Sequence, residues 1–195
     1  RLVCGFAHDV TPELLGDAIA HGKLSRHLRW VNVHKGDVFY VPSGTVHALG
    51  AGVVVAEIQE SSNVTYRVYD YDRVDSHGQK RQLRFDKAMQ VLNMHAGVDV
   101  RQKPRKISFS PGCAREQLCR CQYFEAEHIL VSLSCVVTVT NVSFQVLLCL
   151  DGEGGIETET LTKPIRFQKG DCIFIPAGVG KCYVTGRAEL LKIRC

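Results

Sequence analysis

A pattern that occurs twice constrains the fold more than any other feature of this sequence. The first copy, residues 35–44, reads Lys-Gly-Asp-Val-Phe-Tyr-Val-Pro-Ser-Gly, and the second, residues 169–178, reads Lys-Gly-Asp-Cys-Ile-Phe-Ile-Pro-Ala-Gly. Each copy combines a Gly-Asp turn, a short apolar strand and a Pro-X-Gly bend. We therefore expect two copies of one β unit, each buried in its own barrel.

Alternating and apolar runs elsewhere predict a mainly β chain with a small helical segment. A helix should begin at the N-cap Thr11 and end at Gly22, because Pro12 suits a first helical turn and glycine terminates helices. Further helical pieces are expected over residues 24–28 and 85–94. Strands are expected at residues 31–33, 38–41, 53–58, 65–71, 123–133, 135–139, 144–150, 156–161, 173–175 and 190–193.

Turn residues separate these segments. A loop or hairpin is predicted over residues 70–82 around Ser76-His77-Gly78, and turns are predicted at Asp151-Gly152 and Lys169-Gly170. Residues 97–112 contain two prolines and several basic residues, which is typical of a linker. We therefore expect a first domain over residues 1–96, a linker over 97–112 and a second domain over 113–195.

The composition excludes several classes of protein. The chain has 195 residues, 45% of them hydrophobic, a net charge of +4 and no Lys/Arg run interleaved with aromatic residues, so nucleic acid is not an expected partner. No apolar stretch approaches the roughly 20 residues that cross a bilayer, and a cytoplasmic protein is expected. The nine cysteines are an odd number and do not suggest a disulfide framework. Cys119 and Cys121 are expected to be buried or free thiols. The alternative is that both are metal ligands.

The spacing from Gly36 to His47 carries the first indication of function. Five residues separate Gly36 from Pro42, Gly44 follows, and His47 comes three positions later, which resembles the second metal motif of cupins. A histidine after such a bend points into the barrel, where its neutral imidazole can ligate Zn²⁺. The alternative is a core histidine bonded to a carbonyl group. In the second copy Lys181 occupies the position of His47, and a protonated lysine cannot bind a divalent cation.

A second segment indicates which cupin family the chain resembles. Residues 57–73 read Glu-Ile-Gln-Glu-Ser-Ser-Asn-Val-Thr-Tyr-Arg-Val-Tyr-Asp-Tyr-Asp-Arg. They are similar to the type I mannose-6-phosphate isomerases, particularly the short bacterial form. The resemblance extends over the whole chain and is most specific from Gly36 to Arg73. It implies a double cupin, or jelly-roll, fold whose first barrel is incomplete at its N-terminus and whose second barrel is degenerate.

The resemblance implies a zinc-dependent enzyme that interconverts D-mannose 6-phosphate and D-fructose 6-phosphate, with a sugar phosphate as its small-molecule partner. His47 matches the family's last metal ligand, and Arg67 matches its active-site arginine. A Lewis acid and a fixed positive charge would stabilise the enediolate-like state of such an isomerisation. Arg67 could instead pair with Asp70 or Asp72. On an extended strand, Arg67 and Tyr69 would share a face.

Several residues of the family's metal site are missing from this sequence. The family's other zinc ligands come from a Gln-X-His-Pro segment and a later glutamate, and neither is present here, so we expect a truncated chain whose single zinc ion needs ligands from missing N-terminal sequence. Asn63 and Leu49 also differ from common family residues, and Glu57 and Gln59 either support the site or are solvated. No substrate-binding residue is assigned, and the oligomeric state stays open, with a monomer favoured.

Two other functions remain open from the sequence. A non-catalytic cupin would bind a sugar or a partner chain, would be stable without metal and would bind its ligand equally well after His47→Ala. A cupin oxygenase would require two or three histidines and a carboxylate in one barrel, which this sequence does not supply.

Overall fold

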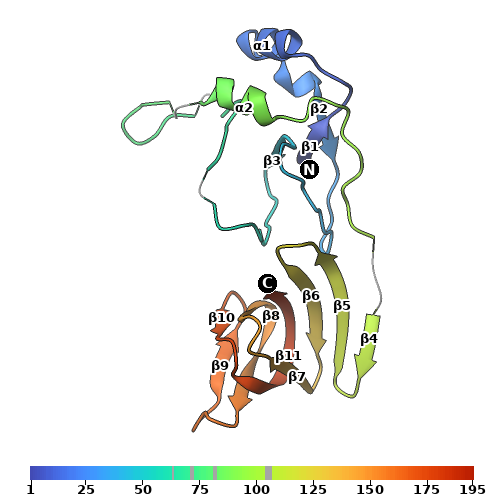
Figure 1. Cartoon of the computed structure of the whole chain (residues 1–195), viewed down its shortest axis with the longest axis vertical. Coiled ribbons are helices and arrows are strands. Elements are labelled where there is room, and N and C mark those ends of the chain that lie inside the picture. Colours follow the sequence, from blue (N-terminus) through green and yellow to red (C-terminus); the bar gives the residue numbers. More distant parts are fainter. Residues whose placement is uncertain (63, 71–72, 81–82, 104–106) are drawn as a thin grey trace. The chain divides into compact units, whose positions relative to one another are not determined.

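The computed structural model describes residues 1–62, 64–70, 73–80, 83–103 and 107–195 of the chain. The chain divides into two compact units, Arg1–Arg101 and Gln102–Cys195. Figure 1 shows the helices gathered in the first unit and a curved β structure in the second. The predicted mainly β fold with a small helical segment is confirmed.

A three-stranded antiparallel sheet organises the first unit. Strand β1 (Leu2–Phe6) lies between β2 (Leu28–Val31) and β3 (His47–Leu49), and all of its residues are buried. Two glycines let a neighbouring segment approach β1 closely, because a β-carbon on Gly5 would lie 2.8 Å from the α-carbon of Gly97. Both β1 and β3 were missed from the sequence, since each is too short to show an alternating pattern.

The helices follow the sequence signals closely. Helix α1 (Pro12–Ala20) begins at Thr11, whose side chain accepts a hydrogen bond from the Leu14 amide at 3.2 Å, and Gly22 follows its end with φ of 65°. The predicted short helical piece is the 3₁₀ helix η1 (Leu24–Arg26). Helix α2 (Phe85–Val91) is shorter than predicted, because the backbone becomes extended at Leu92.

Three predicted strands of the first unit are wrong. Residues 38–41 form no ladder, and Phe39 makes only a single bridge to Arg101. Residues 53–58 have no regular structure, and Val54 is 97% exposed. The described part of residues 65–71 is irregular with a bend at Val68, while Tyr71 lies outside the described residues. Apolar and β-branched residues favour an extended backbone, but a strand also needs a paired neighbour.

The predicted hairpin over residues 70–82 is present in the part that the structure describes. Val74 and Lys80 form an antiparallel bridge on either side of a turn, and the Gly78 amide donates to the Asp75 carbonyl at 3.0 Å. Asp75 also accepts hydrogen bonds from the amides of His77 and Gln79.

The second unit is an eight-stranded antiparallel sheet that curves around an apolar core. Strands β11 (Gly180–Arg194) and β8 (Gln145–Thr158) form its centre, since each pairs with three other strands. The path runs β10-β8-β11-β6-β5-β4, with β7 beside β11 and β9 beside β8. The remaining strands are β4 (Ile107–Ser110), β5 (Cys113–Arg120), β6 (Glu125–Val131), β7 (Ser134–Val139), β9 (Ile165–Gln168) and β10 (Cys172–Ile175).

Some details of this sheet differ from the sequence prediction. The turn predicted at Asp151-Gly152 is wrong, because β8 continues through it and the register with β11 shifts between Glu189 and Leu190. Such a bulge uses the positive φ of Gly152, 82°, without ending the strand. Strands β5 and β9 were missed, since charged residues interrupt their apolar pattern. Strand β4 lies inside residues 97–112, the segment predicted as a linker.

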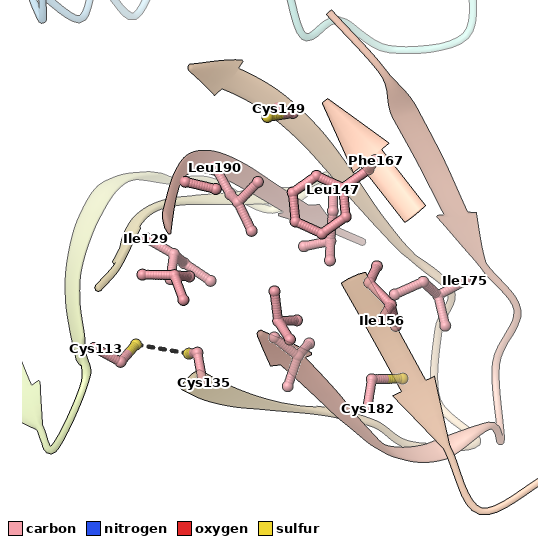
Figure 2. Close-up of a cluster of buried hydrophobic side chains, with 14 of the residues drawn as sticks. Cys113, Ile129, Cys135, Leu147, Cys149, Ile156, Phe167, Ile175, Cys182 and Leu190 are labelled. Carbon is pink, nitrogen blue, oxygen red and sulfur yellow. Dashed lines mark hydrogen bonds between the residues drawn. The ribbon is translucent and has the colours of Figure 1, made fainter. Parts of the chain in front are cut away.

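Buried side chains from seven strands fill the interior of the second unit. Figure 2 shows Ile129, Leu147, Phe167 and Leu190 pointing toward one another from β6, β8, β9 and β11. Burial of such side chains supplies most of the stability of a barrel of this size.

One end of this interior is charged. Glu125, Glu127 and Ile129 alternate along β6, so the two carboxylates share the face of a core residue. Glu125 accepts hydrogen bonds from Arg194 on β11, with Nε 3.0 Å from its Oε1, and Lys192 pairs with Glu127. Buried carboxylates need such partners, because an unpaired buried charge is costly.

The central position of β11 generates a stability prediction. Leu190→Ala should destabilise the second unit by about 2–5 kcal/mol, because Leu190 is fully buried and its loss leaves a cavity. Amide hydrogen exchange of β8 and β11 peptides should show faster opening. Leu133→Ala is the matched control, since Leu133 is 72% exposed. Equal exchange in the two variants would contradict the placement of the core.

The charged end of the barrel generates a pH prediction. The Arg194 hydrogen bond lowers the pKa of Glu125 against the opposing effect of burial, and Arg120 and Lys192 lower it further. A carboxylate with a lowered folded-state pKa stabilises the fold above its unfolded pKa of about 4.3, and this contribution is lost as pH falls through the folded pKa. Urea unfolding followed by circular dichroism should therefore show a shallower loss of stability on acidification for Glu125→Gln. An identical pH dependence in both proteins would refute this.

Candidate metal and substrate site

The two copies of the repeat form the same Gly-Asp turn. In the first, Asp37 Oδ2 accepts a hydrogen bond from the His34 amide at 2.8 Å, and in the second Asp171 Oδ2 accepts one from the Gln168 amide at 2.8 Å. The glycine before each aspartate has a positive φ, 87° at Gly36. The repeated sequence therefore encodes one local structure twice, as a side-chain oxygen replaces a backbone acceptor in the turn.

The Pro-X-Gly bends are also alike, and a neighbouring segment holds each in place. Gly44 and Gly178 both have φ of 82°. The Gly44 carbonyl accepts a hydrogen bond from the Asn93 amide at 2.8 Å, just beyond α2, and the Gly178 amide donates to Thr140 at 2.9 Å. The two copies differ in the strand between turn and bend, because residues 172–175 pair with β8 whereas residues 38–41 make a single bridge.

His47 lies on β3, three residues after the first bend. It pairs in register with Cys4 of β1, and its side chain is exposed. Its Nδ1 lies 3.0 Å from the carbonyl oxygen of Thr45. Because a carbonyl oxygen can only accept, a neutral ring that makes this contact as a hydrogen bond carries its proton on Nδ1 and keeps the lone pair on Nε2. This is the arrangement in which a histidine can bind a metal through Nε2.

The Thr45 carbonyl is a contact of His47 that the sequence did not indicate. Every residue type supplies a backbone carbonyl, so only its place two residues before His47 could have indicated it. Thr45 follows directly after the bend at Gly44.

Arg67 lies in the irregular segment after residue 64 and is half-buried. The two residues that follow it, Val68 and Tyr69, both pack against the apolar cluster around Phe6 and Leu15. The expected alternation of faces is therefore wrong here, because a bend at Val68 replaces the strand. Packing by two neighbours in sequence anchors the backbone beside Arg67.

Partners expected for Arg67 are not seen in the described part of the chain. No ion pair joins Arg67 to Asp70 there, and Asp72 lies outside the described residues. Asn63, which differs from the common family residue, also lies outside them. Arg67 and His47 share no hydrogen bond within the part of the chain that the structure describes. Glu57 is exposed, and the Gln59 side chain donates to the Ser62 carbonyl at 3.3 Å.

A metal ion needs more ligands than His47 provides. Within the described ranges, no group of three or more His, Cys, Asp or Glu side chains is placed to hold a metal. Cys119 is buried and Cys121 half-buried at the end of β5. Lys181, at the position of His47 in the second copy, is exposed on β11 opposite Thr138. A single imidazole does not make a zinc site, which takes three or four ligands.

Comparisons with known proteins place this geometry in context. Residues 115–195 match the family described as "Mannose-6-phosphate isomerase, cupin domain". The crystal structure of the mannose 6-phosphate isomerase from Bacillus subtilis superimposes with a TM-score of 0.87 and 30% identity, over 98% of this chain and 59% of that one. This chain resembles the mannose-6-phosphate isomerases. The predicted resemblance and the cupin fold are thus confirmed.

Curated relatives agree with this resemblance. Mannose-6-phosphate isomerase ManA of Bacillus subtilis is 34% identical over 95% of this chain and 58% of its own length. Mannose-6-phosphate isomerase of Streptococcus mutans is 32% identical over 95% of this chain and 57% of its own length. The chain therefore spans somewhat more than half the length of these relatives. Among the described residues, no helix is both long and apolar enough to cross a membrane.

The close approach at the first bend generates a prediction. A β-carbon on Gly44 would lie 2.5 Å from the Val91 carbonyl oxygen, whereas one on Gly36 would meet no atom within 4 Å. Both glycines have a positive φ, so Gly36→Ala should cost about 1 kcal/mol and Gly44→Ala at least about 1 kcal/mol more. Urea unfolding followed by the fluorescence of Trp30, the single tryptophan, measures both. Equal costs would show that Val91 does not crowd the bend.

Proposed function

We propose that this chain is part of a mannose-6-phosphate isomerase that interconverts D-mannose 6-phosphate and D-fructose 6-phosphate. The observation that carries the proposal is the match to the Bacillus subtilis isomerase structure over 98% of this chain. Relatives named as mannose-6-phosphate isomerases align over 95% of the chain. The substrate would be a small phosphorylated sugar, and the reaction would take place in the cytoplasm.

In this proposal His47 is one ligand of a zinc ion. The Thr45 carbonyl fixes its tautomer, which leaves Nε2 free to bind the metal. The described residues supply no second and third ligand around it, so they do not fit a zinc ion by themselves. The other ligands would come from the roughly two fifths of the relatives' length that this chain does not cover. We therefore propose that sequence corresponding to that part of the relatives completes the zinc site.

Arg67 would supply a fixed positive charge to the reaction. Interconversion of an aldose and a ketose moves a proton between C1 and C2 of the open-chain sugar, and negative charge develops on the C1 and C2 oxygens. A guanidinium held beside those oxygens stabilises this charge without reorganisation. The packing of Val68 and Tyr69 against the core would hold Arg67 in place for this role.

The two units would have different roles in the isomerase. Residues 1–96 would belong to the catalytic barrel and residues 113–195 to a second barrel that binds no metal, with the connection lying in residues 97–112. The exposed Lys181 at the position of His47 supports this division, because a protonated lysine offers no lone pair to a metal.

One observation favours a second function. Because His47 lacks companion ligands in the described part of the chain, a non-catalytic cupin that binds a sugar or another chain would also fit the structure. Such a protein would keep its stability and its ligand affinity after His47→Ala.

An isomerase assay with added Zn²⁺ tests the proposal. It should be run on this chain and on a version extended at its N-terminus with the family's Gln-X-His-Pro segment and following glutamate. The extended protein should be active, and Arg67→Ala should lower its kcat/KM by roughly 100-fold, as expected for the loss of one charge-stabilising group. Arg84→Ala is the matched control.

Metal binding is measured in parallel on the extended protein. His47→Ala should weaken Zn²⁺ binding at least tenfold, whereas His77→Ala should not, because His77 lies in an exposed turn. An extended protein without isomerase activity would sink the proposal. Unchanged Zn²⁺ affinity in His47→Ala would remove His47 from the ligand set.

A further inference from the structure

We propose that Cys113 and Cys135 form a modification site, at which an intramolecular disulfide bond joins strands β5 and β7. Both thiols are free, and their sulfur atoms lie 2.6 Å apart, as the dashed line in Figure 2 marks. An S–S bond is about 2.05 Å long, so the two sulfurs need little further movement to bond. The pair belongs to the second unit, whereas His47 and Arg67 belong to the first.

The backbone sets this proximity. The carbonyl oxygen of Gly112, just before Cys113, accepts hydrogen bonds from the amides of Ser132 and Leu133 at 2.9 and 3.2 Å. A β-carbon on Gly112 would lie 3.0 Å from the Ser134 amide nitrogen, so only glycine allows this approach without displacement. The start of β5 is thus held against the turn that leads into β7, although the two cysteines are 22 residues apart in sequence.

Arg115 is the charged group beside the pair. Its Nη2 lies 3.2 Å from the Cys135 sulfur and also donates to the Val136 carbonyl. A guanidinium in this position favours the thiolate, which is the nucleophile in disulfide exchange. Burial has the larger effect and raises the pKa of Cys135 to about 11, with the Cys113 hydrogen bond acting in the same direction. Thiolate is therefore scarce once the barrel has closed.

Access to the pair is also limited in the folded chain, since Cys113 and Cys135 are only 5% and 4% exposed. The reaction therefore belongs to the open barrel, during folding or transient opening. Closure of the barrel then shields the two sulfur atoms from solvent, whether they are present as two thiols or as a disulfide.

The oxidant is a low-molecular-weight disulfide. One cysteine thiolate attacks it, its S–S bond breaks, and one small thiol leaves, which gives a mixed disulfide on the protein. The second cysteine thiolate then attacks the protein sulfur of that mixed disulfide and displaces the second small thiol. Two electrons pass from the cysteine pair to the oxidant, and the two thiol protons leave with the two small thiols.

The test uses the whole chain with Cys172→Ser and Cys195→Ser, because these two exposed cysteines would otherwise link separate molecules. The reduced chain is refolded in a glutathione redox buffer, quenched with acid and measured by mass spectrometry. We expect a loss of about 2 Da and a peptide that links Cys113 to Cys135. The bond should be absent in Cys135→Ser and present in Cys149→Ser, which removes an equally buried thiol.

Two further readouts separate a bond that fits the fold from a chance product. The thermal midpoint of the oxidised chain should exceed that of the reduced chain by roughly 10 °C, since the bond closes a loop in the unfolded state. The folded reduced chain should be oxidised at least tenfold more slowly than the unfolded chain. Refolding that yields no bond, a different pair, or an oxidised chain with a lower midpoint would overturn the proposal.

Discussion

A backbone hydrogen bond that ties each Pro-X-Gly bend to a distant segment underlies both units of this protein. In the first unit the Gly44 carbonyl accepts from Asn93, and in the second the Gly178 amide donates to Thr140. Each bend needs a positive φ at its glycine, and a β-carbon on Gly44 would lie 2.5 Å from the Val91 carbonyl oxygen. Strand β3 follows the first bend and is held in register by its pairing with β1.

Local signals predicted local structure well. The two Gly-Asp turns and helix α1 depend on residues within a few positions of one another, and each is present. Strands were less predictable, because a strand exists only where a partner lies beside it. Residues 172–175 pair with β8, whereas the equally apolar residues 38–41 form a single β-bridge, between Phe39 and Arg101. Asp151-Gly152 likewise suits both a turn and a β-bulge. Which of the two forms depends on the register between β8 and β11.

The candidate site shows the same division. The spacing from Gly36 picked out His47, but it could not indicate the Thr45 carbonyl, which any residue would provide. The face of Arg67 was inferred from strand periodicity, and that inference failed where a bend lets two consecutive residues pack on one cluster. The Cys113–Cys135 contact was also out of reach, because it depends on the approach of Gly112 to a turn about twenty residues further along the chain.

In the proposed isomerase, His47 presents an unprotonated Nε2 to a metal ion because the Thr45 carbonyl holds the proton on Nδ1. Nitrogen-15 NMR of the histidine side chains measures this directly, since the two ring nitrogens have distinct shifts in each tautomer. At a pH where the ring is neutral, we expect the Nδ1–H tautomer for His47, and a change at its Nε2 when Zn²⁺ is added to the N-terminally extended protein. An Nε2–H tautomer, or a Zn²⁺-induced change confined to other histidines, would contradict it.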